Sequence, residues 1–188
     1  MKFDDFKSKY GGYPLISASL FAGEQNPSYV RRQVTEWQNK GLLLQLKRGY
    51  YVINSEPYKG RASLPYLANQ LYFPSYISLE WALSYYNMIP EHVFALTSVS
   101  TKKTIVFDTP LACFRYRSLS SRLFFGFKEA SIDSHKVLIA EKEKALIDYI
   151  YLNASVFSSS DDVVESLRLE GIRELRKTVL TKYLRIVN

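Results

Sequence analysis

The chain has 188 residues, of which 47% are hydrophobic and 23% are charged. This balance is typical of a folded globular protein and excludes a disordered chain, which would be too polar to offset the entropy lost on folding. Apolar runs such as residues 42–44 and 149–152, the latter as long as any in the chain, are far too short to cross a bilayer. Residues 1–5 (MKFDD) lack the apolar core of a signal peptide. We therefore expect a cytoplasmic protein with no membrane partner.

The charge balance is basic, with 25 lysines and arginines against 18 aspartates and glutamates and a formal net charge of +7. Such an excess favours a nucleic-acid partner, although it is a weak signal taken alone. The single cysteine, Cys113, excludes an intramolecular disulfide framework and a cysteine-rich zinc site. The two histidines, His92 and His135, have no metal-ligand spacing around them. We expect no metal and no cofactor.

The sequence divides at a turn-rich stretch, residues 54–60 (NSEPYKG). The first 60 residues carry a net charge of +4, whereas the remaining two thirds of the chain carry +3. We expect a basic domain over residues 1–57 and a second domain over residues 61–188.

The first domain is predicted to contain three helices. The first covers residues 4–10 and is followed by an extended segment that includes Pro14. Ser17 is expected to cap a short helix over residues 18–22. Ser28 is expected to cap a longer helix, which runs to residue 40 and ends at a glycine.

The helix over residues 28–40 has two distinct faces. Val30, Val34 and Trp37 recur at helical spacing and predict the buried side. The other side combines arginines with small hydrogen-bonding residues, which suits a DNA major groove because arginine pairs with guanine and asparagine with adenine. The residues expected in the groove are Ser28, Tyr29, Arg31, Arg32, Thr35 and Asn39. For this helix alone, a plain solvated face is the alternative interpretation.

Residues 42–53 predict a strand, a tight basic turn and a second strand. Two helices joined by a turn and followed by such a hairpin form the order of a winged helix-turn-helix. In that architecture the second helix enters the groove and the hairpin lies on phosphates. Lys47 and Arg48 at the tip are expected to contact the DNA backbone. A winged helix that binds only protein is the remaining alternative.

Three sequence blocks resemble the AbiEi family of antitoxin-regulators and lie in that family's order. Residues 41–52 (GLLLQLKRGYYV) are similar to its wing, and residues 74–83 (PSYISLEWAL) to its "psYvSleSAL" segment. Residues 140–148 (AEKEKALID) are similar to its "a-pEKAlLDl" segment. Trp81 stands where the family usually has a small residue, and Lys142 where proline is common.

The resemblance implies the antitoxin of a two-gene type IV toxin–antitoxin pair that acts in abortive infection, a phage defence. In that family the winged domain represses the operon's own promoter by binding inverted repeats in double-stranded DNA. The C-terminal domain counteracts a nucleotidyltransferase-like toxin, without a required stable contact. The implied state is a monomer or a dimer induced by DNA.

The second domain is predicted to be a mixed helix–antiparallel sheet–helix unit, which makes the expected fold class α+β. Helices are expected over residues 64–71, 78–87, 141–152, 163–169 and 172–187. Short runs rich in β-branched and aromatic residues predict strands over residues 93–99, 103–107, 112–119, 123–127 and 137–139.

Basic residues in this second domain are a candidate for a second nucleic-acid surface. Arg115 and Arg117 alternate along one predicted strand and so share a face. With aromatic neighbours, such a face would bind nucleic acid by phosphate contact and stacking. The candidate residues are Lys102, Lys103, Arg115, Arg117 and Arg122, with Lys128 also nearby in sequence. The simpler interpretation is an ordinary polar sheet face. The alternative functions are RNA binding through this sheet and the basic helix over residues 172–187, or a protein-interaction adaptor.

The sequence does not predict an enzyme. It contains neither a G-x-x-x-x-G-K-[ST] phosphate loop nor a G-x-G-x-x-G turn. Cys113 lies in a predicted strand and is interpreted as a small buried hydrophobe rather than a nucleophile. Ser78 and Glu80 are interpreted as a helix cap and a first-turn acid. We therefore expect a DNA-binding repressor and antitoxin without catalytic residues.

Overall fold

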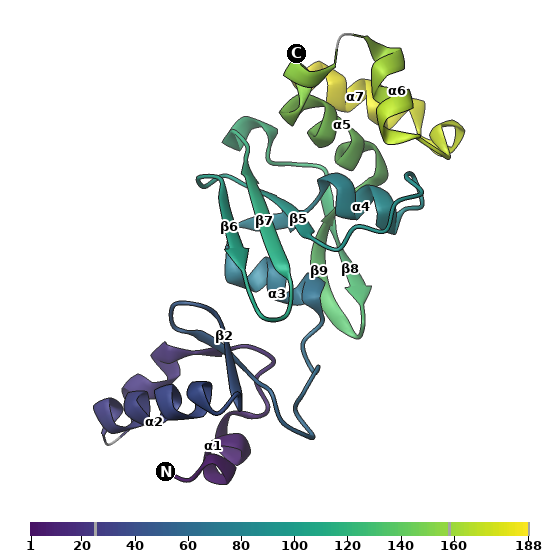
Figure 1. The fold of residues 1–188 in the computed structure, drawn as a ribbon. Coiled ribbons are helices and arrows are strands. Elements are labelled where there is room, and N and C mark those ends of the chain that lie inside the picture. The colour runs from purple at the N-terminus through teal and green to yellow at the C-terminus, as the bar shows by residue number, and fades with distance from the viewer. Residues whose placement is uncertain (25, 158, 188) are drawn as a thin grey trace.

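The computed structural model describes residues 1–24, 26–157 and 159–187 and confirms an α+β protein. A small N-terminal unit is joined by a turn-rich linker to a larger unit that ends in helices (Figure 1). No helix among the described residues is long and apolar enough to cross a membrane.

The small unit combines helices with a three-stranded antiparallel sheet in the order β1-β3-β2. Its elements are α1 (Phe3–Tyr10), β1 (Ile16–Ser17), the 3₁₀ helix η1 (Ala18–Gly23), α2 (Pro27–Asn39), β2 (Leu43–Lys47) and β3 (Tyr50–Ile53). The short helix expected over residues 18–22 is therefore a 3₁₀ helix, and the other elements follow the predicted order.

Aromatic side chains fill the core of the small unit. Phe6 is fully buried, with its ring centroid 4.8 Å from that of Trp37 and 5.8 Å from that of Phe21. Tilted aromatic pairs of this kind add about 0.5–1.5 kcal/mol each beyond area burial. Val30 and Val34 are buried beside Trp37, as the sequence predicts. This core fixes one face of α2 inward, so the opposite face must point to solvent.

The larger unit is built on a six-stranded sheet with the strand order β6-β7-β5-β4-β9-β8. The first elements are α3 (Leu64–Leu71), β4 (Ser75–Ile77), α4 (Leu79–Tyr85), β5 (Leu96–Ser100), β6 (Ile105–Asp108), β7 (Cys113–Ser118) and η2 (Ser121–Leu123). The remaining ones are β8 (Phe127–Ile132), β9 (His135–Ala140), α5 (Lys142–Leu152), η3 (Ala154–Val156), α6 (Ser160–Leu167), η4 (Ile172–Glu174) and α7 (Lys177–Val187).

The sheet is mixed, which corrects the antiparallel sheet predicted from the sequence. β4 pairs with β9 in parallel, and so does β5 with β7, while the other neighbours are antiparallel. The sequence does not predict β4, which is fully buried and lacks an alternating pattern. Residues 123–127, expected as a strand, contain the end of η2 and the first residue of β8.

The β2–β3 hairpin belongs to two hydrophobic cores. Leu43 and Ile53 are buried in the core of the small unit, whereas Leu46 and Val52 are buried in the core of the larger unit. β2 also contacts β6, an edge strand of the six-stranded sheet. In Figure 1 the tip of this hairpin accordingly points toward the larger unit.

A fully buried ion pair connects two of the blocks that resemble the AbiEi family. Lys144 and Asp148, one turn apart on α5, are each 1% exposed and pair with one another. The hydroxyls of Tyr76 and Ser78 donate hydrogen bonds of 2.9 and 2.8 Å to Asp148 Oδ2. Burial lowers the pKa of Lys144 and raises the pKa of Asp148. The hydrogen bonds from β4 and its neighbour therefore help to offset the cost of burying two charges.

Ser78 does not cap α4 in the way the sequence predicts. It occupies the N-cap position, but its side chain makes no capping bond and donates to Asp148 instead. That hydrogen bond ends on a carboxylate, and charge-assisted hydrogen bonds are stronger than those between neutral groups. Glu80 lies in the first turn of α4, as predicted.

Removing one partner of the buried pair should destabilise the protein more than removing both. Lys144→Met leaves the Asp148 carboxylate buried without its cation, which costs about 3–5 kcal/mol. The double variant Lys144→Met/Asp148→Leu carries neither charge and should recover much of that loss. Urea unfolding measures both free energies, and a double variant as unstable as Lys144→Met would contradict this account.

Candidate nucleic-acid interface

The sequence contains clear signals for both ends of α2. Asn26 caps the N-terminus, since its Oδ1 accepts a 3.0 Å hydrogen bond from the Tyr29 amide, and Pro27 occupies the first turn. Ser28, expected as the cap, therefore lies inside the helix with an exposed side chain. Gly41 follows the C-terminus with a φ of 67°, a left-handed value that a glycine adopts without strain.

All six residues predicted to enter the groove are exposed, on the side opposite the buried valines and Trp37. Four of them, at spacings of four, three and four residues, form a line along the helix. That line is Ser28, Arg32, Thr35 and Asn39, and Tyr29 and Arg31 flank it.

The side chains on this face make few contacts that a ligand would have to break. Arg32 Nε lies 3.7 Å from Glu36 Oε1 in an exposed ion pair. Such a pair contributes little to stability. The Thr35 hydroxyl donates a 3.2 Å hydrogen bond to the carbonyl of Arg31. Within the described residues, the Arg31 guanidinium has neither an ion pair nor a hydrogen bond.

Lys47 and Arg48, both expected to contact phosphates, have different surroundings at the hairpin turn. Arg48 is exposed beside Gly49, whose φ of 80° closes the turn. Lys47 is half-buried, and its ammonium donates to the Leu71 carbonyl and lies 4.2 Å from the Tyr50 ring centroid. Burial lowers the pKa of Lys47. Lys47 therefore holds the hairpin against the larger unit, and Arg48 is the one available for a phosphate.

Two members of the predicted second basic surface lie next to this hairpin. Lys102 and Lys103 are exposed, and the Lys102 ammonium lies 5.5 Å from the ring centroid of Tyr72. The positive charge of Lys102 contributes to the lowered pKa of Lys47, so the two cations are neighbours despite their separation in sequence. Lys102 therefore lies near Lys47, at the junction of the two units.

The other members lie elsewhere, so the five residues do not form one face. Tyr116 points toward α3, and its alternating neighbour Arg117 points to the other side of the sheet. Arg117 donates a 2.8 Å hydrogen bond to the Leu152 carbonyl at the end of α5, where the helix dipole favours a cation. Arg115 is exposed on β7, and Arg122 is exposed in η2, which contacts α7.

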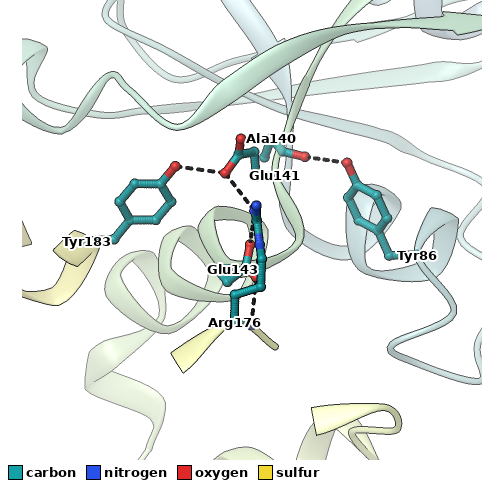
Figure 2. A network of polar contacts seen from close by, with 6 residues as sticks. All are labelled: Tyr86, Ala140, Glu141, Glu143, Arg176 and Tyr183. Carbon is teal, nitrogen blue, oxygen red and sulfur yellow. Dashed lines mark hydrogen bonds and ion pairs between the residues drawn. The ribbon is translucent and has the colours of Figure 1, made fainter. Parts of the chain in front are cut away.

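A polar network that the sequence does not predict attaches the last helix to the N-terminus of α5 (Figure 2). Arg176 donates two 3.0 Å hydrogen bonds to the buried Glu143 and one of 3.1 Å to Glu141. Tyr183 of α7 donates a 2.8 Å hydrogen bond to the same Glu141. Arg176 lies between η4 and α7, and its amide also donates to Glu143. This contact is why the single helix expected over residues 172–187 is divided.

The titratable groups of the larger unit are engaged in packing. Burial raises the pKa of Tyr76 and of Asp148 and lowers the pKa of Lys144. Cys113 is half-buried at the start of β7, His92 is exposed, and His135 begins β9. No group of three or more His, Cys, Asp or Glu in the described part of the chain is placed to bind a metal ion.

The Glu143–Arg176 contact should make the protein sensitive to acid. The hydrogen bonds from Arg176 lower the pKa of Glu143 to about 2. A carboxyl with a folded-state pKa below its unfolded value of about 4.3 stabilises the fold above that value and loses this contribution as the pH falls. We expect thermal stability to fall between about pH 4.5 and pH 2.

Glu143→Gln is the variant that isolates this group. It should be about 2 kcal/mol less stable at pH 7, below the range for fully buried pairs because the Arg176 side chain is more than half exposed. Its loss of melting temperature between pH 4.5 and pH 2 should be smaller than that of wild type. Parallel pH profiles for the two proteins would contradict this assignment.

Comparison of the chain with protein-family models and with curated proteins finds no match. The case for a function therefore rests on the geometry described above and on the three sequence blocks.

Proposed function

We propose that the small unit is a winged helix-turn-helix that binds duplex DNA, with α2 in the major groove. The order of helix, strand, short helix, helix and hairpin, with strands arranged β1-β3-β2, supports this proposal. The observation that carries it is the exposed face of α2. Guanidinium, hydroxyl and amide groups form that face together with one carboxylate, that of Glu36, and an entirely buried apolar face lies opposite.

Electrostatics supports the same proposal. α2 has no acidic residue in its first turn, so the positive end of its dipole is free to attract a phosphate. Arg48 contacts the backbone of the same duplex from the hairpin turn, and Lys102 and Lys103 extend the contact to further phosphates. Lys47 is left out of this set because its ammonium is already engaged.

We further propose a role as repressor and antitoxin, which rests on the resemblance to the AbiEi family. The chain would repress its own promoter by binding inverted repeats, as monomers or as a dimer induced by DNA. The larger unit would counteract a nucleotidyltransferase-like toxin without chemistry of its own. A gene for such an enzyme next to this one would support the antitoxin role directly.

The alternative of an RNA-binding sheet has less support. It needs the basic residues of the larger unit on one face with aromatic neighbours. Arg117 is instead bonded to the end of α5, and Lys102 lies at the hairpin.

The first test is binding of the full chain to the DNA upstream of its own gene. At about 0.15 M salt, a specific site should be bound about 10³-fold more tightly than a scrambled duplex of the same length. Fluorescence anisotropy with both duplexes measures this ratio. Equal affinity for the two sequences would overturn the repressor proposal.

Two arginine variants then separate groove reading from phosphate contact. Arg32→Ala, in the middle of the outer line of α2, should reduce the preference for the upstream sequence by about 1–3 kcal/mol. Arg48→Ala should weaken binding to both duplexes equally. It should also lower the slope of log affinity against log salt concentration by about 1. Lys128→Ala, exposed on β8 at the far edge of the sheet, is the charge-matched control. Identical behaviour of the two arginine variants would contradict the assigned roles.

A further inference from the structure

A cavity of about 250 Å³ lies where the small unit, the linker and the larger unit meet. Leu44 and Val52 of the hairpin form one wall, and Leu64 and Leu111 of the larger unit contribute to another. This volume is close to the lower end of the range for small-molecule sites, about 300 Å³. Because the walls come from both units, an occupant would contact both at once.

The cationic groups at this cavity have no anionic partner in it. Lys59 and Arg61 line it, and its lining residues include no aspartate or glutamate. Arg61 stacks 4.5 Å from the Tyr58 ring centroid and donates through Nε and Nη1 to the carbonyls of Pro57 and Gly11. Among the described residues, Arg61 Nη2 and the Lys59 ammonium have no hydrogen-bond partner. Arg61 is therefore held in position with donor groups left over, which suits a carboxylate.

One of the two tyrosines of the site is held in place by its neighbours. Tyr13 and Tyr58 both line the cavity. Gly11 packs so closely on Tyr58 that any side chain at position 11 would overlap the tyrosine ring. The ring is thereby fixed between the α1–β1 loop and the guanidinium of Arg61. Leucine, valine and tyrosine side chains beside a cation suit an anion that carries an apolar ring.

We propose that this cavity binds a small aromatic carboxylate, with Arg61 and Lys59 on the carboxylate and the tyrosine and leucine side chains on the ring. We also propose that the ligand regulates DNA binding, because it would sit between the unit that carries α2 and the larger unit. This regulatory half rests on the proposed function, whereas the binding half does not.

The probe is 2-naphthoate, titrated into the full chain by calorimetry, with neutral 2-naphthylmethanol as its uncharged counterpart. Wild type should bind 2-naphthoate with submillimolar affinity and the alcohol at least tenfold more weakly. Arg61→Gln should weaken 2-naphthoate binding at least tenfold. Lys128→Gln, which removes one exposed positive charge far from the cavity, should leave it unchanged. Melting temperatures of both variants within a few degrees of wild type show that they fold.

The proposed binding site would be overturned if wild type does not bind 2-naphthoate, or if Arg61→Gln binds it as tightly as wild type does. If Arg61→Gln does not fold, equal binding of 2-naphthoate and the alcohol to wild type overturns the carboxylate assignment by itself. Saturating 2-naphthoate should change the affinity for the upstream duplex at least threefold, and no change would overturn the regulatory half. If the protein binds 2-naphthoate but does not bind the upstream DNA, the proposed DNA-binding function is contradicted and the ligand site is not.

Discussion

The β2–β3 hairpin is the constraint on which the rest of the structure depends, because its side chains are buried in both hydrophobic cores. Leu43 and Ile53 pack under α2, while Leu46 and Val52 pack into the larger unit. Two units joined by a linker alone would be expected to move relative to each other. Here the hairpin limits that movement, so the exposed face of α2 has a defined orientation to the six-stranded sheet. The cavity beside the linker exists for the same reason.

The lysines and arginines of the chain do not all serve one purpose. Some are engaged inside the fold: Lys144 in the core, Arg176 just before the last helix, Arg117 at the end of α5 and Lys47 at the unit junction. Others are exposed, among them Arg31 and Arg32 on α2 and Arg48 at the hairpin turn. The net charge of +7 therefore indicates a partner less directly than the position of these exposed arginines does.

Local patterns in the sequence predict the parts of the fold that depend on local physics. The spacing of Val30, Val34 and Trp37 predicts the buried side of α2, and Gly41 its end. Parallel pairing, the buried strand β4 and the division of the last helix depend on residues distant in sequence, and local patterns miss them. For the site, the exposed face of α2 follows from periodicity. The burial of Lys47 does not, because it depends on Leu71 across the unit junction.

The most direct test of the central claim is hydroxyl-radical footprinting with the upstream duplex and with a scrambled one. Tyr29 on α2 and Tyr151 on α5 are nearly equally exposed, at 49% and 45%, so each is an internal reference for the other. The account predicts that the upstream duplex slows oxidation of Tyr29 severalfold and leaves Tyr151 unchanged. Protection of Tyr151 with Tyr29 still reactive, or no protection of either, would contradict DNA binding through α2.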